Sequence, residues 1–163
     1  MPSALCALVV DDVAAVRSYI SQILQSLGIS SVFEAADGNS ARRLFSQYRP
    51  DMVFLDIQLP DINGQQLLKS FRLEHEPAVV FMVSAFSSVD NLKMAVENGA
   101  SAFVVKPFSA SRITSLVQPL QAMAAHLRDE WQQAGVQTLR QQEQLCQTLE
   151  ASARNLHSQA AAQ

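Results

Sequence analysis

Short apolar runs alternate with longer segments of mixed polarity from Leu5 to about residue 125 of this chain. The runs that we predict to be strands are Leu5–Val10, Val32–Ala36, Met52–Leu55, Val79–Val83 and Ala102–Val105. Most are continuously apolar rather than alternating, which is typical of strands covered on both faces of a parallel sheet.

The segments between these runs carry apolar residues at helical spacing. We predict helices at about residues 13–27, 39–48, 65–72 and 88–98, and a fifth from about residue 110. Asn39 or Ser40 is expected to cap the second helix, and Ser109 the fifth. Five strand–helix repeats predict an α/β fold, a flavodoxin-like, doubly wound, five-stranded parallel sheet in the order 2-1-3-4-5.

The composition changes after Pro119, where glutamine and alanine become frequent. From Gln118 onward there are eleven glutamines, one glycine and no lysine. We therefore place one domain at residues 4–125 and a helical extension at residues 126–163. Apolar residues in the extension keep a coiled-coil-like spacing that shifts by one residue near 135–138. The pattern predicts a long C-terminal helix that needs a partner, with a coiled coil as one option.

Polar residues follow four of the predicted strands, at the edge of the sheet where ligands bind in such folds. Asp11 and Asp12 follow the first strand, Asp56 the third, Ser84 the fourth and Lys106 the fifth. If the first and third strands are neighbours, three carboxylates crowd together and call for a divalent cation. A lysine beside them suits a phosphoryl group. The pattern predicts a Mg²⁺ site next to a carboxylate that can be phosphorylated.

The chain is mildly acidic, with 12 basic and 15 acidic residues and a net charge of −3. This balance argues against nucleic-acid binding, which depends on concentrated lysine and arginine. No apolar stretch approaches the roughly 20 residues that a membrane span needs, and the N-terminal residues do not resemble a signal peptide. We therefore expect a cytoplasmic protein that binds neither nucleic acid nor membrane.

Together, these motifs resemble the receiver domain of two-component response regulators, in the form of a chemotaxis-type single-domain regulator with a C-terminal helical extension. The residues that carry the resemblance are Asp11-Asp12, Asp56–Gly64, Ser84-Ala85 and Lys106-Pro107-Phe108. The resemblance implies that a sensor histidine kinase or phosphotransfer protein delivers a phosphoryl group to Asp56. Signalling would then proceed by protein contact or by homodimerisation through the C-terminal helix.

The resemblance also implies a role for each site residue. Asp56 would be the phosphoacceptor, and Lys106 and Ser84 would bind phosphoryl oxygens. Asp12, Asp56 and the backbone carbonyl of Gln58 would hold Mg²⁺, with Asp11 acting mainly through metal-bound water.

The family's switch would be formed by Ser84 and Phe103. Ser84 would move toward the phosphoryl group, and Phe103 would then turn inward. Such a domain catalyses only its own phosphotransfer and dephosphorylation, so we expect no other enzyme activity.

Three alternatives remain open from the sequence. The chain could be a receiver with a coiled linker, part of a larger regulator whose output domain lies outside this sequence. An aspartyl-nucleophile phosphatase is disfavoured because such enzymes usually carry a second aspartate two residues after the nucleophile, where Gln58 stands. The third alternative is that Asp11 and Asp12 only cap the N-terminus of the following helix, where negative charge is favoured. We interpret Asp51 and Asp61 as turn residues rather than ligands.

Overall fold

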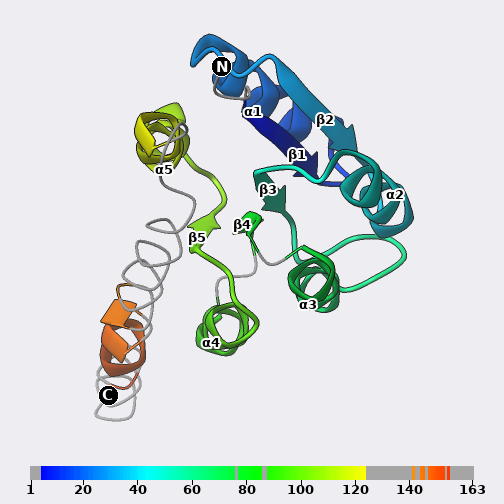
Figure 1. Ribbon diagram of the computed structural model, residues 1–163. Helices are drawn as coiled ribbons and strands as arrows, with labels where there is room; N and C mark the ends of the chain where they lie inside the picture. The colour runs from blue at the N-terminus through cyan, green and yellow to red at the C-terminus, as the bar shows by residue number, and fades with distance from the viewer. Residues whose placement is uncertain are drawn as a thin grey trace.

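The computed structural model describes residues 5–75, 77–85, 88–123, 141, 144, 145, 147–152 and 154 (Figure 1). In this part of the chain the strands are β1 (Cys6–Val10), β2 (Ser31–Ala35), β3 (Met52–Leu55), β4 (Val79–Ser84) and β5 (Ala102–Val105). The helices that the same residues form are α1 (Ala14–Ser26), α2 (Gly38–Tyr48), α3 (Gly64–Glu74), α4 (Val89–Glu97) and α5 (Ala110–Met123).

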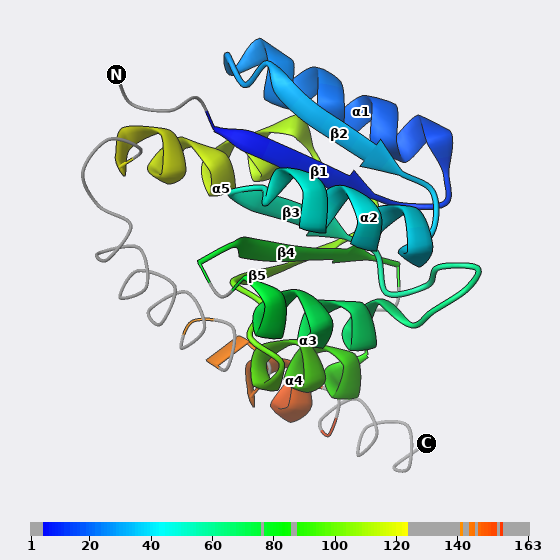
Figure 2. The same cartoon turned by 45° about the vertical axis from the view of Figure 1, so that its right-hand side comes forward.

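The strands form a parallel sheet in the order β2-β1-β3-β4-β5, which confirms the predicted fold (Figures 1 and 2). In the register of β1 and β3, Val10 lies opposite Leu55. The residues that follow are Asp11 and Asp56, so both carboxylates leave the sheet at the same edge. The backbone N–H of Asp56 donates to the Val10 carbonyl at 3.0 Å, which continues the ladder to the site.

Alternate residues of each strand enter one of two apolar layers, because side chains along a strand point to opposite faces. The layer beneath α2, α3 and α4 contains Leu8, Val10, Val53, Leu55, Val80 and Met82 from the sheet. The layer beneath α1 and α5 contains Ala7, Val9, Met52, Phe54, Phe81 and Val83. Coverage on both faces explains why the strand sequences are almost entirely apolar.

The structure confirms one of the two N-cap predictions made from the sequence. The side chain of Ser109 accepts a hydrogen bond from the Arg112 N–H at 3.2 Å, which confirms the expected cap of α5. The expected cap of α2 was wrong. Asp37 is the N-cap and accepts from the Ser40 N–H at 2.7 Å, because Asn39 and Ser40 already lie in the first helical turn.

Most of the predicted extension at residues 126–163 lies outside the described residues, and so do its expected coiled-coil positions apart from Leu149. Helix α5 continues through Pro119 to Met123. Further along, residues 147–152 are helical, and Glu150 forms an ion pair with Lys93 of α4. Figures 1 and 2 both place this orange segment beside α4. None of the helices in the described residues combines the length and apolarity needed to cross a lipid bilayer.

A pair of stacked, buried rings joins α2 to α3. Phe45 and Phe71 are 0% and 1% exposed, and their ring centroids lie 4.1 Å apart. We expect Phe71→Ala to lower the free energy of unfolding by about 3–5 kcal/mol, because it leaves a cavity where the ring packed. Urea denaturation followed by circular dichroism measures this loss. Leu73→Ala, at a side chain of α3 that is 87% exposed, is the control and should cost much less.

Candidate functional site

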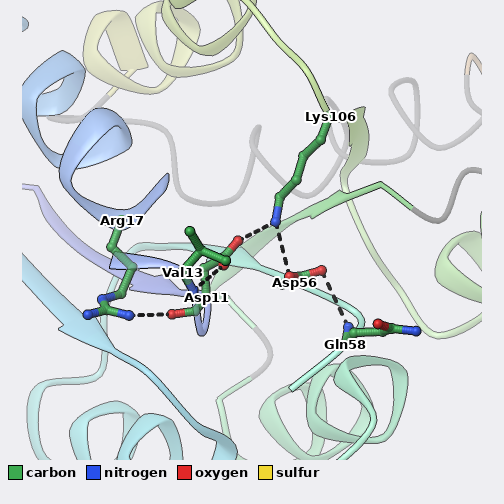
Figure 3. A network of polar contacts seen from close by, with 6 residues as sticks. All are labelled: Asp11, Val13, Arg17, Asp56, Gln58 and Lys106. Atoms are coloured by element: carbon green, nitrogen blue, oxygen red, sulfur yellow. Dashed lines mark hydrogen bonds and ion pairs between the residues drawn. The ribbon is translucent and has the colours of Figure 1, made fainter. Parts of the chain in front are cut away.

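Asp11 and Asp56 are acidic side chains buried at the carboxyl edge of the sheet, 2% and 5% exposed (Figure 3). The Val13 N–H donates to Oδ1 of Asp11 at 2.8 Å. The Gln58 N–H donates to Oδ1 of Asp56 at 3.3 Å. Each carboxylate is therefore oriented by a backbone amide two residues further along the chain, while its second oxygen points toward Lys106.

Lys106 bridges the two carboxylates from the end of β5. Its Nζ lies 2.5 Å from Oδ2 of Asp11 and 3.1 Å from Oδ2 of Asp56 (Figure 3). Partial burial acts to lower the pKa of Lys106, but the hydrogen bonds and charges of Asp11 and Asp56 outweigh it, so the pKa is raised. The contacts that raise this pKa stabilise the fold fully at pH values below the ordinary lysine pKa. Their contribution is lost as pH rises through the raised pKa. Lys106 is therefore charged at neutral pH.

Asp12 completes an acidic group at this edge. One carboxylate oxygen from each of Asp11, Asp12 and Asp56 lies within 4.8 Å of the others, and Asp12 is exposed. Oxygen donors gathered in this way fit a hard divalent cation such as Mg²⁺. The structure therefore brings together the three carboxylates predicted from the sequence, with one of them open to solvent.

The loop between Asp56 and α3 folds back onto the end of β3. The Gly64 N–H donates to the Ile57 carbonyl at 2.6 Å, and Gln58 pairs with Asn63 in an antiparallel bridge. A Cβ at Gly64 would lie only 2.0 Å from the Asp56 carbonyl oxygen. Only glycine permits this approach, and the loop thereby holds the Gln58 backbone beside the acidic group.

The two expected switch residues are both buried. Ser84 is 0% exposed, and its carbonyl accepts from the Lys106 N–H at 3.0 Å. Phe103 is 4% exposed and packs in the layer beneath α2, α3 and α4. Its ring thus already occupies an interior position in this structure.

Sequence reasoning missed Arg17. Its Nη1 donates to the Asp11 carbonyl at 2.7 Å (Figure 3), and its Nε lies 3.4 Å from Oε1 of Glu34. Arg17 therefore fixes the turn that carries Asp11 and Asp12. Its place in the first turns of the helix after the acid pair was a usable signal, because that helix end faces the site.

Asp61 was interpreted as a turn residue, and the structure gives it specific partners. Its two carboxylate oxygens accept from the backbone N–H groups of Gly38 and Asn39, at 2.7 and 2.9 Å. Because those partners are more than 20 residues away and in another element, no local pattern could have indicated them.

Comparison with known proteins agrees with the geometry. Residues 7–118 match the family model of the response regulator receiver domain. The chain is 34% identical to chemotaxis protein CheY of Bacillus subtilis over 110 residues, which are 68% of this chain and 92% of that protein. It is 32% identical over 111 residues to a probable transcriptional regulator, ycf27 of Porphyridium aerugineum, but these residues are 45% of that longer protein.

Solved receiver structures are similar to this chain as well. The receiver domain of NtrX from Brucella abortus matches with a TM-score of 0.65 and 31% identity, covering 69% of this chain and 95% of that one. A CheY-like receiver from Methanospirillum hungatei matches with a TM-score of 0.67 and 24% identity, covering 87% of this chain and 98% of that one, and supports the fold alone. The comparisons confirm the resemblance, and a larger regulator has no better support than a single-domain one.

The bridging position of Lys106 makes a prediction about stability. Without divalent cations, Lys106→Met should lower the free energy of unfolding by about 1–3 kcal/mol, because two buried carboxylates lose a charged hydrogen-bond partner. Millimolar Mg²⁺ should restore part of the loss. Urea denaturation with chelator and with Mg²⁺ measures both effects. Lys69→Met, at an exposed lysine of α3, is the control, and equal losses in the two variants would contradict the bridging role.

Proposed function

The chain belongs to the response regulator receiver family and is a phosphorylation-dependent response regulator, and on this premise we propose that Asp56 accepts the phosphoryl group. The observation that carries the proposal is the 3.1 Å contact between Lys106 Nζ and Oδ2 of Asp56. A cation held against this buried carboxylate is placed to bind an oxygen of a phosphoryl group on the same carboxylate.

In the proposed transfer, a carboxylate oxygen of Asp56 attacks phosphorus and forms an O–P bond as the bond from phosphorus to the donor breaks. With a phosphohistidine of a sensor kinase or phosphotransfer protein as donor, imidazole is the leaving group. With acetyl phosphate, acetate leaves. Lys106 would bind one phosphoryl oxygen and the hydroxyl of Ser84 another.

Receiver domains bind Mg²⁺ at an acidic pocket, and the donor set of this chain fits that ion. We assign direct binding to the carboxylates of Asp12 and Asp56 and the backbone carbonyl of Gln58, with Asp11 acting through bound water. All these donors are oxygens, as Mg²⁺ prefers. When bound, the ion offsets the repulsion between the Asp56 carboxylate and the anionic donor.

Ser84 and Phe103 are our candidates for the switch. Ser84 ends β4, and Phe103 lies in neighbouring β5, opposite Met82. A shift of Ser84 toward a phosphoryl group would alter the packing between these strands and α4. Packed interiors change between discrete arrangements rather than gradually, so a small shift can move the surface that α4 and β5 present.

The extension at residues 126–163 is the output element in this proposal. Its support is the ion pair between Lys93 of α4 and Glu150, which joins the extension to the surface that the switch would move. Output would be homodimerisation through the extension or binding of another protein. Receiver domains are generally signalling modules rather than enzymes, and we propose no nucleic-acid or membrane partner and no chemistry beyond phosphotransfer and dephosphorylation.

Phosphorylation tests the assignment of Asp56. After incubation with acetyl phosphate and Mg²⁺, intact-mass spectrometry should detect one phosphoryl adduct on the wild type and none on Asp56→Ala. Asp51→Ala is the matched control, because Asp51 contacts the Cys6 N–H at the start of β1, away from the site, and it should keep the adduct. An adduct on Asp56→Ala would sink the assignment. Steady turnover of p-nitrophenyl phosphate would favour the phosphatase alternative.

Charge reversal tests the link between α4 and the extension. Glu150→Lys should change the monomer–dimer equilibrium by up to about 5-fold, because an exposed ion pair contributes about 0–1 kcal/mol. Adding Lys93→Glu should reverse part of the change by restoring opposite charges, while the pair between Glu150 and Arg154 stays lost. Light scattering over a range of concentrations measures the equilibrium, with Lys69→Glu on α3 as control. Failure of the double variant to return toward wild type would show that the ion pair does not control assembly.

A further inference from the structure

The loop that carries Gln58 is anchored at its near end and at its tip. Near β3, the Gly64–Ile57 hydrogen bond and the Gln58–Asn63 bridge close the loop. At the tip, Asp61 reaches out of the loop to the N-terminus of α2. The loop therefore spans from the acidic group to a different helix, with Gln58 between the two anchors.

The contact at the tip is bidentate. Oδ1 of Asp61 accepts from the Gly38 N–H at 2.7 Å, and Oδ2 accepts from the Asn39 N–H at 2.9 Å. These are the first amides of α2, which have no carbonyl partner within the helix. The next amide, that of Ser40, is bound by Asp37 at 2.7 Å. Two aspartates thus share the helix end, one from its own cap and one from the loop after Asp56.

Packing reinforces the contact. A Cβ at Gly38 would lie 2.1 Å from Cγ2 of Ile62, the residue after Asp61. The helix end and the loop tip can approach this closely only because position 38 is glycine. Both the charge and the shape of the α2 N-terminus are therefore matched to residues 61 and 62.

We propose that Asp61 is a positioning residue for the metal site: by binding the N-terminus of α2, it holds the loop so that the Gln58 carbonyl faces bound Mg²⁺. The inference rests on the proposed function, in which that carbonyl is a metal ligand. Asp61 itself touches neither the metal nor the phosphoryl group. It acts by fixing the backbone that does.

Electrostatics favours the ionised form of Asp61. The hydrogen bond from Gly38 is the largest cause that lowers the pKa of this carboxyl, with the Asn39 N–H and the charge of Arg42 also contributing. Because the pKa is lowered, the contact stabilises the fold at pH values above the ordinary pKa of the carboxyl. This stabilisation is lost as pH falls through the lowered pKa. At the neutral pH of a phosphorylation assay the anchor is in place.

Calorimetric titration of the full chain with Mg²⁺ alone tests the inference without any phosphodonor. Asp61→Ala should weaken Mg²⁺ binding by about 10-fold, the lower end of what a group supporting a metal ligand contributes. Asp61→Asn, which keeps one acceptor oxygen, should be intermediate. The Mg²⁺ concentration that gives a half-maximal phosphorylation rate with acetyl phosphate should rise by a similar factor, because the Gln58 carbonyl is displaced rather than removed.

Two matched variants separate positioning from plain helix stability. Asp37→Ala removes the other side-chain cap of the same helix and should lower the melting temperature without weakening Mg²⁺ binding. Gly38→Ala should weaken Mg²⁺ binding like Asp61→Ala, because its methyl group would push Ile62 and the loop tip away. Equal Mg²⁺ affinity in wild type and Asp61→Ala, or an equal loss in Asp37→Ala, would overturn the inference while leaving Asp56 as acceptor. A wild type that binds no Mg²⁺ would overturn the metal site together with the inference.

Discussion

The constraint behind this site is that carboxylates from neighbouring parallel strands are forced together at one edge of the sheet. The register of β1 and β3 places Asp11 and Asp56 side by side, both nearly buried. Like charges in such a position repel, and Lys106 offsets the repulsion from β5. One ammonium group against three carboxylates still leaves the site net negative. The site is therefore suited to a divalent cation and an anionic donor.

Contacts extend from this edge to the outer surface of the molecule. Gly64 packs on the Asp56 carbonyl, and Gln65 beside it donates from Nε2 to the Asn91 carbonyl of α4 at 2.9 Å. Two residues further along α4, Lys93 pairs with Glu150. Asp56, α3, α4 and the extension thus form one contiguous series of contacts. In the proposed function, this series gives a phosphorylation signal at Asp56 a short physical route to the extension.

The sequence was sufficient for the sheet and for the acidic group, because both follow from short-range patterns. Continuous apolar runs identified the strands, and the strand order then brought Asp11 and Asp56 together. The cap of α2 was mistaken because Asp37, Asn39 and Ser40 are all good capping residues, and only the backbone conformation distinguishes them. The hydrogen bonds of Asp61 were not predicted because its partners, Gly38 and Asn39, lie on another element. Long-range hydrogen bonds of this kind leave no periodic trace in a sequence.

Locating the phosphoryl group tests the central claim most directly. An acyl phosphate is reduced by borohydride, which converts the modified aspartate to homoserine. Peptide sequencing by tandem mass spectrometry then identifies the position. We expect homoserine at position 56 after phosphorylation and reduction, with Asp11 and Asp12 unchanged. Homoserine at position 11 or 12, or a phosphoryl group that resists reduction and maps to Ser84, would contradict the account.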